Sequence, residues 1–155
     1  MLRAFQGVLN KPANTMCKAT VPLKTGMAVV VDEVSGSVSL PGGVMGMGIS
    51  FVDKERVPVG INTARGDMSD YDPQFNEVAE DELVKVISFL PMTDIFGTDQ
   101  FEEAGLTANC WVVANESGKM VKGEGIETLY KFIQFYEDNG HKLAMIKKVD
   151  AYIGS

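Results

Sequence analysis

Three features are scarce in this chain of 155 residues: it has one histidine, two cysteines and no long run of apolar residues. A bilayer-spanning helix needs an apolar run of about 20 residues, and the segment Met1–Asn10 also lacks the apolar stretch of a secretory signal. Cys17 and Cys110 stand far apart in a chain without an export signal, so we expect free thiols and neither a disulfide nor a thiolate metal site. These scarcities predict a soluble protein that is made in a cytosol.

The single imidazole, His141, limits the chemistry that is available. Nucleophilic catalysis by serine or cysteine needs a base with a pKa near neutrality, and a third group must orient that base. His141 directly follows the turn-like pair Asn139-Gly140, so we expect an exposed turn residue. A zinc site would need further ligands at short spacing, and no second histidine exists. We therefore expect no catalytic residues, no cofactor and a protein that is not an enzyme.

Acidic residues outnumber basic residues by 21 to 14, and the excess is unevenly placed. Residues 1–66 carry seven basic and four acidic side chains, residues 67–103 carry eleven acidic side chains and one lysine, and the remainder is neutral. A basic start and a strongly acidic middle suit docking between copies or onto an oppositely charged partner. Four basic residues among the first 24 are too scattered for a phosphate-binding surface, so we expect protein partners and no nucleic acid.

Sixteen glycines and six prolines divide the chain into short segments rich in β-branched and aromatic residues. Such segments, at a spacing of roughly 8–12 residues, are typical of β-barrels and β-sandwiches. The pair Asn139-Gly140 supplies the positive φ angles of a tight hairpin turn. By contrast, Thr98–Ala104 contains a capping box that predicts one helical turn. The expected strands are Met27–Val31, Ser37–Leu40, Ile49–Val52, Val57–Ile61, Glu82–Leu90, Cys110–Ala114, Leu129–Tyr136 and Lys142–Val149.

Together these patterns predict a mainly β fold: a compact β-barrel or sandwich of about eight short strands with one or two short helices. Residues 1–21 are expected to form either an extended N-terminal arm or the first strand. Residues 22–155 are expected to form a single β-rich domain that is interrupted by an acidic excursion over residues 62–82. Trp111 stands in an apolar strand and is expected to anchor the core.

The acidic excursion contains the candidate metal ligands. Asp67, Asp70 and Asp72, together with Asn76 and Glu77, supply oxygen ligands of the kind that calcium prefers. Their spacing does not match a helix-loop-helix calcium site, which needs carboxylates at alternate positions, a central glycine and a glutamate at the twelfth position. A solvated loop is therefore the first interpretation. A cation site, in a small acidic binding module or a hydrolase, is the alternative.

The candidate interaction residues lie in the N-terminal segment and in the glycine-rich loop Pro41–Gly48. This loop precedes a strand, whereas a phosphate cradle follows a strand and opens a helix, so we interpret it as a flexible or closely packed loop. Its methionines can pack into a neighbour. An N-terminal arm can add to the edge of a neighbouring sheet through main-chain hydrogen bonds. The candidates are Arg3, Phe5, Lys11 and Lys18 in the segment, and Met45 and Met47 in the loop.

Several short segments follow one another along the chain: Gly26–Asp32, Gly60-Ile61, Glu82–Lys85, Thr98–Phe101, Leu106–Asn109 and Gly118-Lys119. Their order resembles that of small virion proteins of tailed bacteriophages that decorate or cement the capsid. The resemblance is one of layout, with a glycine-led strand, a glycine-rich turn and an apolar strand that ends near Gly-Lys. It implies a compact β-barrel that binds the shell as a trimer, dimer or monomer, and it transfers no functional residue. The resemblance covers about Pro22 to Val149.

The first hypothesis is therefore a non-enzymatic phage structural protein that stabilises the capsid exterior. Its expected partners are the major capsid protein and copies of itself, as a homo-oligomer on the particle, with no nucleic acid and no membrane. Its expected location is the virion, after synthesis in the host cytoplasm. A tail or connector component, such as a tube subunit, is the alternative within the structural class. The acidic cation-binding module is the alternative from another class.

Overall fold

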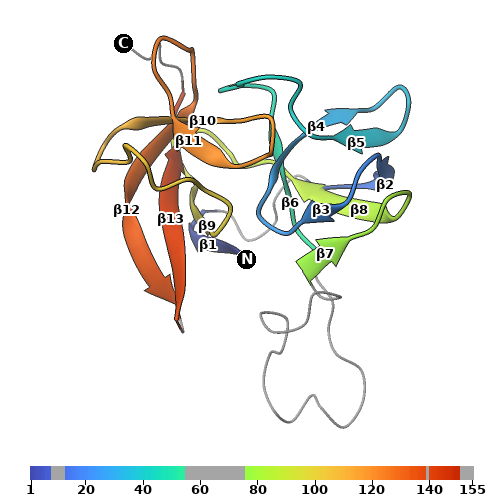
Figure 1. Cartoon of the computed structure of the whole chain (residues 1–155), viewed down its shortest axis with the longest axis horizontal. Coiled ribbons are helices and arrows are strands. Elements are labelled where there is room, and N and C mark those ends of the chain that lie inside the picture. Colours follow the sequence, from blue (N-terminus) through green and yellow to red (C-terminus); the bar gives the residue numbers. More distant parts are fainter. Residues whose placement is uncertain (8–12, 55–75, 139, 151–155) are drawn as a thin grey trace, which may run out of the picture.

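The computed structural model describes residues 1–7, 13–54, 76–138 and 140–150. The elements within these ranges are β-strands, arranged as a six-stranded sheet, a closed five-stranded barrel and a two-stranded ribbon (Figure 1). The predicted mainly β fold is confirmed, with thirteen strands in these ranges instead of about eight. The predicted strand Val57–Ile61 and most of the acidic excursion lie outside the described residues.

The six-stranded sheet combines the start of the chain with its last third, and all of its neighbouring strands pair antiparallel. Asp138 pairs with His141, and Gly140 has a φ of 86°, so the predicted tight hairpin is confirmed. In spatial order the strands are β1 (Leu2–Gln6), β9 (Ile95–Thr98), β13 (His141–Lys148), β12 (Tyr130–Asp138), β10 (Trp111–Ala114) and β11 (Met120–Lys122).

The barrel closes because β2 pairs with two strands, parallel with β5 and antiparallel with β8. Both described parts of residues 1–21 are thus strands, one in the sheet and one in the barrel. A ribbon of β3 (Leu23–Lys24) and β7 (Glu77–Val78) completes the described fold. In order around the ring, the barrel strands are β2 (Ala13–Ala19), β5 (Ser37–Ser39), β4 (Ala28–Asp32), β6 (Ser50–Val52) and β8 (Leu83–Ile87).

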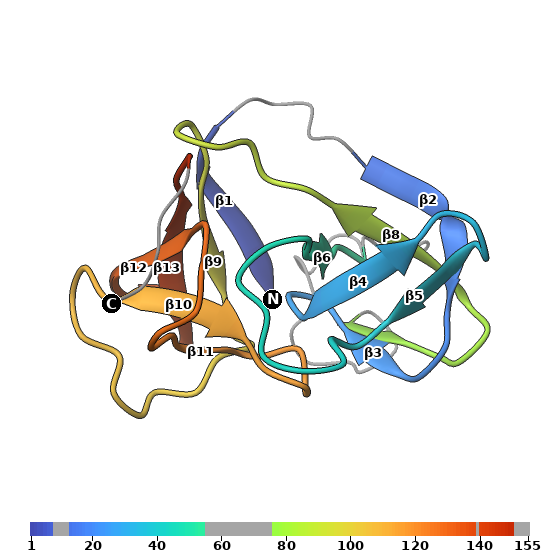
Figure 2. The ribbon, with the colours of Figure 1, turned by 90° about the horizontal axis from the view of Figure 1, so that it is seen from above.

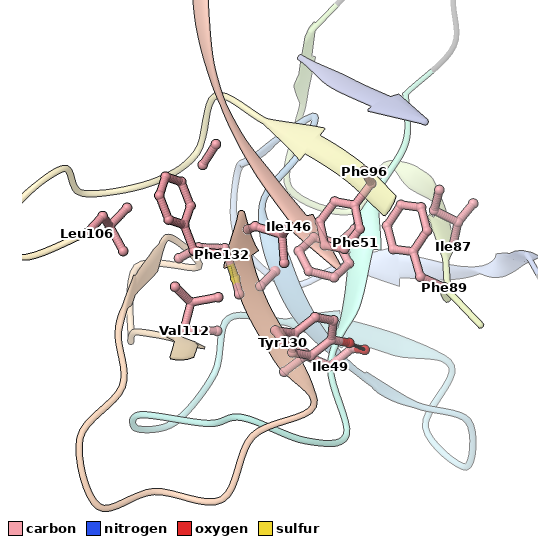
Figure 3. Packing of buried hydrophobic residues seen from close by; sticks show 14 residues of the cluster. Ile49, Phe51, Ile87, Phe89, Phe96, Leu106, Val112, Tyr130, Phe132 and Ile146 are labelled. Atoms are coloured by element: carbon pink, nitrogen blue, oxygen red, sulfur yellow. Dashed lines mark hydrogen bonds between the residues drawn. The ribbon is translucent and has the colours of Figure 1, made fainter. Parts of the chain in front are cut away.

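The barrel has an apolar interior and also presents apolar residues to the sheet, because successive residues of a strand point to opposite faces. On β6, Val52 belongs to the barrel interior, whereas its neighbour Phe51 packs in the cluster shared with the sheet. On β8, Val84 and Val86 point inward, and Ile87 joins the shared cluster. Figure 3 shows Phe51 among rings from both parts of the molecule. One hydrophobic cluster therefore spans barrel and sheet, and a second, separate cluster fills the barrel interior.

The connection from β8 to β9 ties the barrel to the sheet, which lie side by side in Figure 2. The buried carboxylate of Asp94 accepts a hydrogen bond from the Leu90 amide at 2.6 Å. The amide of Met92 donates to the Lys148 carbonyl at 2.9 Å, and the Lys148 amide donates to the Asp94 carbonyl at 3.1 Å. Desolvation lowers the pKa of the half-buried Lys148 side chain, and the charge of Asp94 partly opposes this effect.

The glycine-rich loop forms a second tie between the two parts. Met45 and Ala114 exchange two backbone hydrogen bonds of 2.9 and 2.7 Å, and the Leu129 amide donates to the Gly46 carbonyl at 3.1 Å. Met45 and Gly46 thereby bridge to Ala114 and Thr128, at the place where β10 and β12 no longer pair with each other. The loop is expected to be either flexible or closely packed, and at Met45 and Gly46 it is closely packed.

Two local predictions are wrong. Thr98–Ala104 does not form a helical turn, because Ile95–Thr98 is strand β9, held between β1 and β13. The buried Thr98 hydroxyl donates to the Gly26 carbonyl at 2.8 Å and accepts the Gln100 amide at 3.0 Å. Trp111 is only half buried, with the Lys131 ammonium 5.6 Å from its ring, so it does not anchor the core.

Candidate interaction surfaces

Several of the residues considered as candidates for catalysis, metal binding or interaction do not form a site within the described residues. His141 opens β13 and is half buried rather than exposed. Lys11 and the candidate metal ligands Asp67, Asp70 and Asp72 lie outside the described residues. Within the described ranges, no three histidine, cysteine, aspartate or glutamate side chains are grouped closely enough to hold a metal ion.

Arg3 and Phe5 contact the chain's own sheet. The guanidinium of Arg3 pairs with the Asp138 carboxylate, and it lies 5.4 Å from the ring of Phe5 and 5.6 Å from that of Tyr136. The rings of Phe5 and Tyr136 meet edge to face at 4.9 Å. These side chains of β1 therefore help to hold the strand against the sheet.

The other candidates divide into one half-buried and two exposed residues. Met45 is half buried and packs against the shared core. Met47, in the same loop, has 43% of its surface exposed. Lys18 is exposed on the outer face of the barrel, where it pairs across to Leu83 on β8 and to Ser37 on β5. Lys18 and Leu83 therefore lie on the same outer face, and Leu83 is 61% exposed.

Two further apolar side chains lie near this face, and each is presented by a turn that a polar side chain closes. Met16, which is 85% exposed, sits in a bulge of β2 where the Asn14 carboxamide oxygen accepts the Met16 amide at 2.9 Å. The same oxygen accepts the Cys17 thiol at 3.6 Å. Met16 is therefore held outward by its own backbone.

Val34 is presented in the same way at the tip of the β4–β5 hairpin, where it is 99% exposed. The Asp32 carboxylate accepts the amides of Val34 and Ser35 at 2.9 and 3.3 Å, and the Ser35 hydroxyl at 2.7 Å. Asn14 and Asp32 thus each bind the amide two residues on, and in both cases that residue is the exposed apolar one. This repeat fixes the backbone at two exposed apolar residues.

We name the set Met16, Lys18, Val34 and Leu83 the barrel patch. Residues 13–17 and 33–36 line a shallow groove of about 690 Å³, so Met16 and Val34 share one depression. Apolar residues whose backbone is fixed beside a groove and a lysine can bind a complementary protein surface without a further loss of backbone conformational entropy. Sequence reasoning selected only Lys18 of these four residues. The signal for Met16 and Val34 was the pattern of Asn or Asp two positions before an apolar residue in a turn, and Leu83, in strand β8, gave no such signal.

The turn that presents Val34 is expected to respond to acid. The Ser35 hydroxyl, and then the amides of Ser35 and Val34, hold the pKa of Asp32 below its ordinary value of 3.8. A lowered folded-state pKa stabilises the fold above the ordinary value, and this contribution is lost as the pH falls through the folded-state pKa. We expect the protection of the Val34 and Ser35 amides, measured by NMR as the exchange rate relative to the intrinsic rate at the same pH, to fall below that pH.

The matched control for this prediction is Asp32→Asn, which keeps an acceptor oxygen but does not titrate. Its melting temperature should differ from that of the wild type at pH 7, and the difference should shrink as the pH falls below 3.8. A difference that stays constant between pH 7 and pH 2 would show that the charge of Asp32 does not stabilise the turn.

The described residues contain no helix long and apolar enough to cross a membrane. Comparisons of the chain with protein-family models, with curated proteins and with solved structures find no match.

Proposed function

We propose that the protein is a non-enzymatic structural protein that binds a larger protein assembly through the barrel patch. The observation that carries this proposal is the pair of polar-capped turns that hold Met16 and Val34 in solvent. An isolated exposed apolar residue needs no explanation, but two that hydrogen-bonded turns present beside one groove favour a binding role. The exposed Lys18 next to them favours a partner surface with acidic or carbonyl groups.

The assembly that we propose is the capsid of a tailed phage, with the protein on its exterior as a decoration or cement protein. The support is the layout of the sequence, which resembles that of such proteins, and the patch, which supplies the contact that a cement protein needs. Many weak contacts that repeat over a shell add up through avidity, so the single contact can be small. The barrel and sheet, tied through Asp94 and through Met45-Gly46, would supply a stiff body between the contacts.

The test is the binding of Val34→Ser to empty capsids of the phage that encodes the chain. Because Val34 is exposed, the variant should remain folded, and its affinity should fall at least about tenfold, as for a preorganised apolar anchor. Sedimentation of capsids with bound protein measures the affinity. Val44→Ser is the matched control, since Val44 is also exposed but lies on the glycine-rich loop away from the patch.

Unchanged binding of a variant with serine at Met16, Val34 and Leu83 together would overturn the role of the patch. Electron microscopy of the purified protein addresses the alternative within the structural class. A decoration protein is expected to remain small in solution and to bind only when capsids are present. Rings or tubes that form without capsids would instead identify a tail or connector subunit.

A further inference from the structure

Strand β1 sits in a site that is built from the rest of the chain. The ammonium group of Met1 lies 2.6 Å from the Asp99 carboxylate and donates to the Thr25 carbonyl at 3.4 Å. The Met1 carbonyl accepts the Asp99 amide at 3.3 Å. From there, Leu2 to Gln6 pair with β9 along the open edge of the sheet, with a bulge after Ala4.

The side chains of β1 also have specific places. Phe5 lies across Gly97, where a Cβ atom would come within 2.6 Å of the Phe5 ring and would force the ring to move. Beyond Gly97 the ring meets Tyr136, and Arg3 covers both rings while it pairs with Asp138. The strand brings positive groups, and the site supplies the carboxylates of Asp99 and Asp138, so the two are complementary in charge as well as in shape.

Very little of the core depends on β1. Arg3, Ala4 and Gln6 are exposed, Leu2 and Phe5 are half buried, and no residue of β1 is among the fully buried ones. Outside β1 itself, residues 1–6 contact segments from Thr25 onward, so these contacts can form with either copy of the chain supplying the strand. When a terminal strand moves to an identical site, its contacts are regained, and the free-energy difference is limited to the connection and the lost freedom of the two chains.

We propose that β1 is an exchangeable strand, and that β1 of one copy occupies the sheet edge of a neighbouring copy in the assembled state. The partner is thus a second copy of this chain. The proposal rests on the proposed function only for the crowding of copies on a surface, which raises their effective concentration to about the millimolar range. The six steps from Gly7 to Ala13 reach at most about 20 Å, so donor and acceptor must be adjacent copies.

The experiment mixes two variants, each of which carries one of the two cysteines that a cross-linker can join. One has Arg3→Cys and the other Asp138→Cys, both in a background with Cys17→Ala and Cys110→Ala. The two are refolded together from denaturant, so that slow exchange cannot hide the product, and concentrated to about 1 mM. A short bismaleimide then joins thiols that are close. Phe5 and the Met1 ammonium still hold the strand in the Arg3→Cys variant.

A covalent heterodimer on denaturing gels is the expected result, at a yield that rises with protein concentration. The control pairs Arg3→Cys with Glu116→Cys, since Glu116 is exposed in the turn between β10 and β11, away from the β1 site. Equal heterodimer in the control would overturn the proposal. So would the absence of heterodimer when a chain that carries both Arg3→Cys and Asp138→Cys cross-links internally, because the strand would then stay in its own copy. The test uses no capsids, and its failure would leave the role of the barrel patch untouched.

Discussion

Replacing Phe51 with alanine is expected to lower the free energy of unfolding by about 4 kcal/mol. Phe51 is fully buried on barrel strand β6, and its ring centroid lies 4.7 Å from Phe96 and 5.7 Å from Tyr130, both on the sheet (Figure 3). It also lies 5.5 Å from Phe89, which stacks on Phe96. The alanine would leave a cavity between the barrel and the sheet, bordered by strands that are fixed by hydrogen bonds and cannot move in to fill it.

Urea unfolding with two probes measures this effect. The fluorescence of Trp111, the single tryptophan, reports on the sheet, and far-ultraviolet circular dichroism reports on all strands. Both transitions should coincide in the wild type and shift together in the variant, because one core spans both parts. Phe51→Leu, which refills most of the space, should lose much less stability. A Trp111 transition that stays at the wild-type midpoint would contradict the shared core.

The elements that the sequence predicts correctly are those whose evidence is local. Short apolar segments between turn residues predict strands at Ile49–Val52 and Cys110–Ala114, and strands β6 and β10 lie within these bounds. The β12–β13 hairpin follows from the backbone preference of one dipeptide. In each case the deciding interactions lie within about ten residues along the chain, so the pattern is visible without knowledge of the fold.

The error at Thr98 and Asp99 has the opposite cause. An aspartate three residues before a glutamate favours a capped helix when only local interactions compete. Here the Thr98 hydroxyl donates a hydrogen bond to the Gly26 carbonyl, and the Asp99 carboxylate forms an ion pair with the ammonium group of Met1. Both partners are more than 70 residues away in sequence. Strand β9 pairs with β1 on one side and with β13 on the other. It therefore gains more hydrogen bonds as a strand than one helical turn would supply.

The barrel patch was only partly predictable for a related reason. An apolar residue such as Val34 between polar residues gives no periodic signal, and its exposure follows from the closure of the hairpin turn by Asp32. Lys18 and Leu83 become neighbours only when β2 closes the barrel against β8. Surfaces of this kind depend on strand order, which local sequence patterns do not determine.

Replacing Gly46 with alanine is expected to lower the free energy of unfolding by about 3 kcal/mol. A Cβ atom at Gly46 would overlap the carbonyl oxygen of Glu127 and come within 2.5 Å of Thr128 Cβ. The clash with a backbone atom cannot be relieved by a side-chain rotation, so the loop would have to withdraw from the sheet. The backbone hydrogen bonds between Met45 and Ala114 would then be lost, together with the bond from Leu129 to Gly46.

The control lies four residues away in the same loop. A Cβ atom at Gly42 would meet nothing within 4 Å, so Gly42→Ala should leave stability unchanged or raise it by about 0.5 kcal/mol through the loss of freedom in the unfolded chain. Thermal unfolding measures both variants. Hydrogen exchange shows where the structure is weakened: the Met45, Ala114 and Leu129 amides should lose protection in Gly46→Ala and keep it in Gly42→Ala. Equal stabilities for the two variants would mean that the glycine-rich loop does not tie the barrel to the sheet.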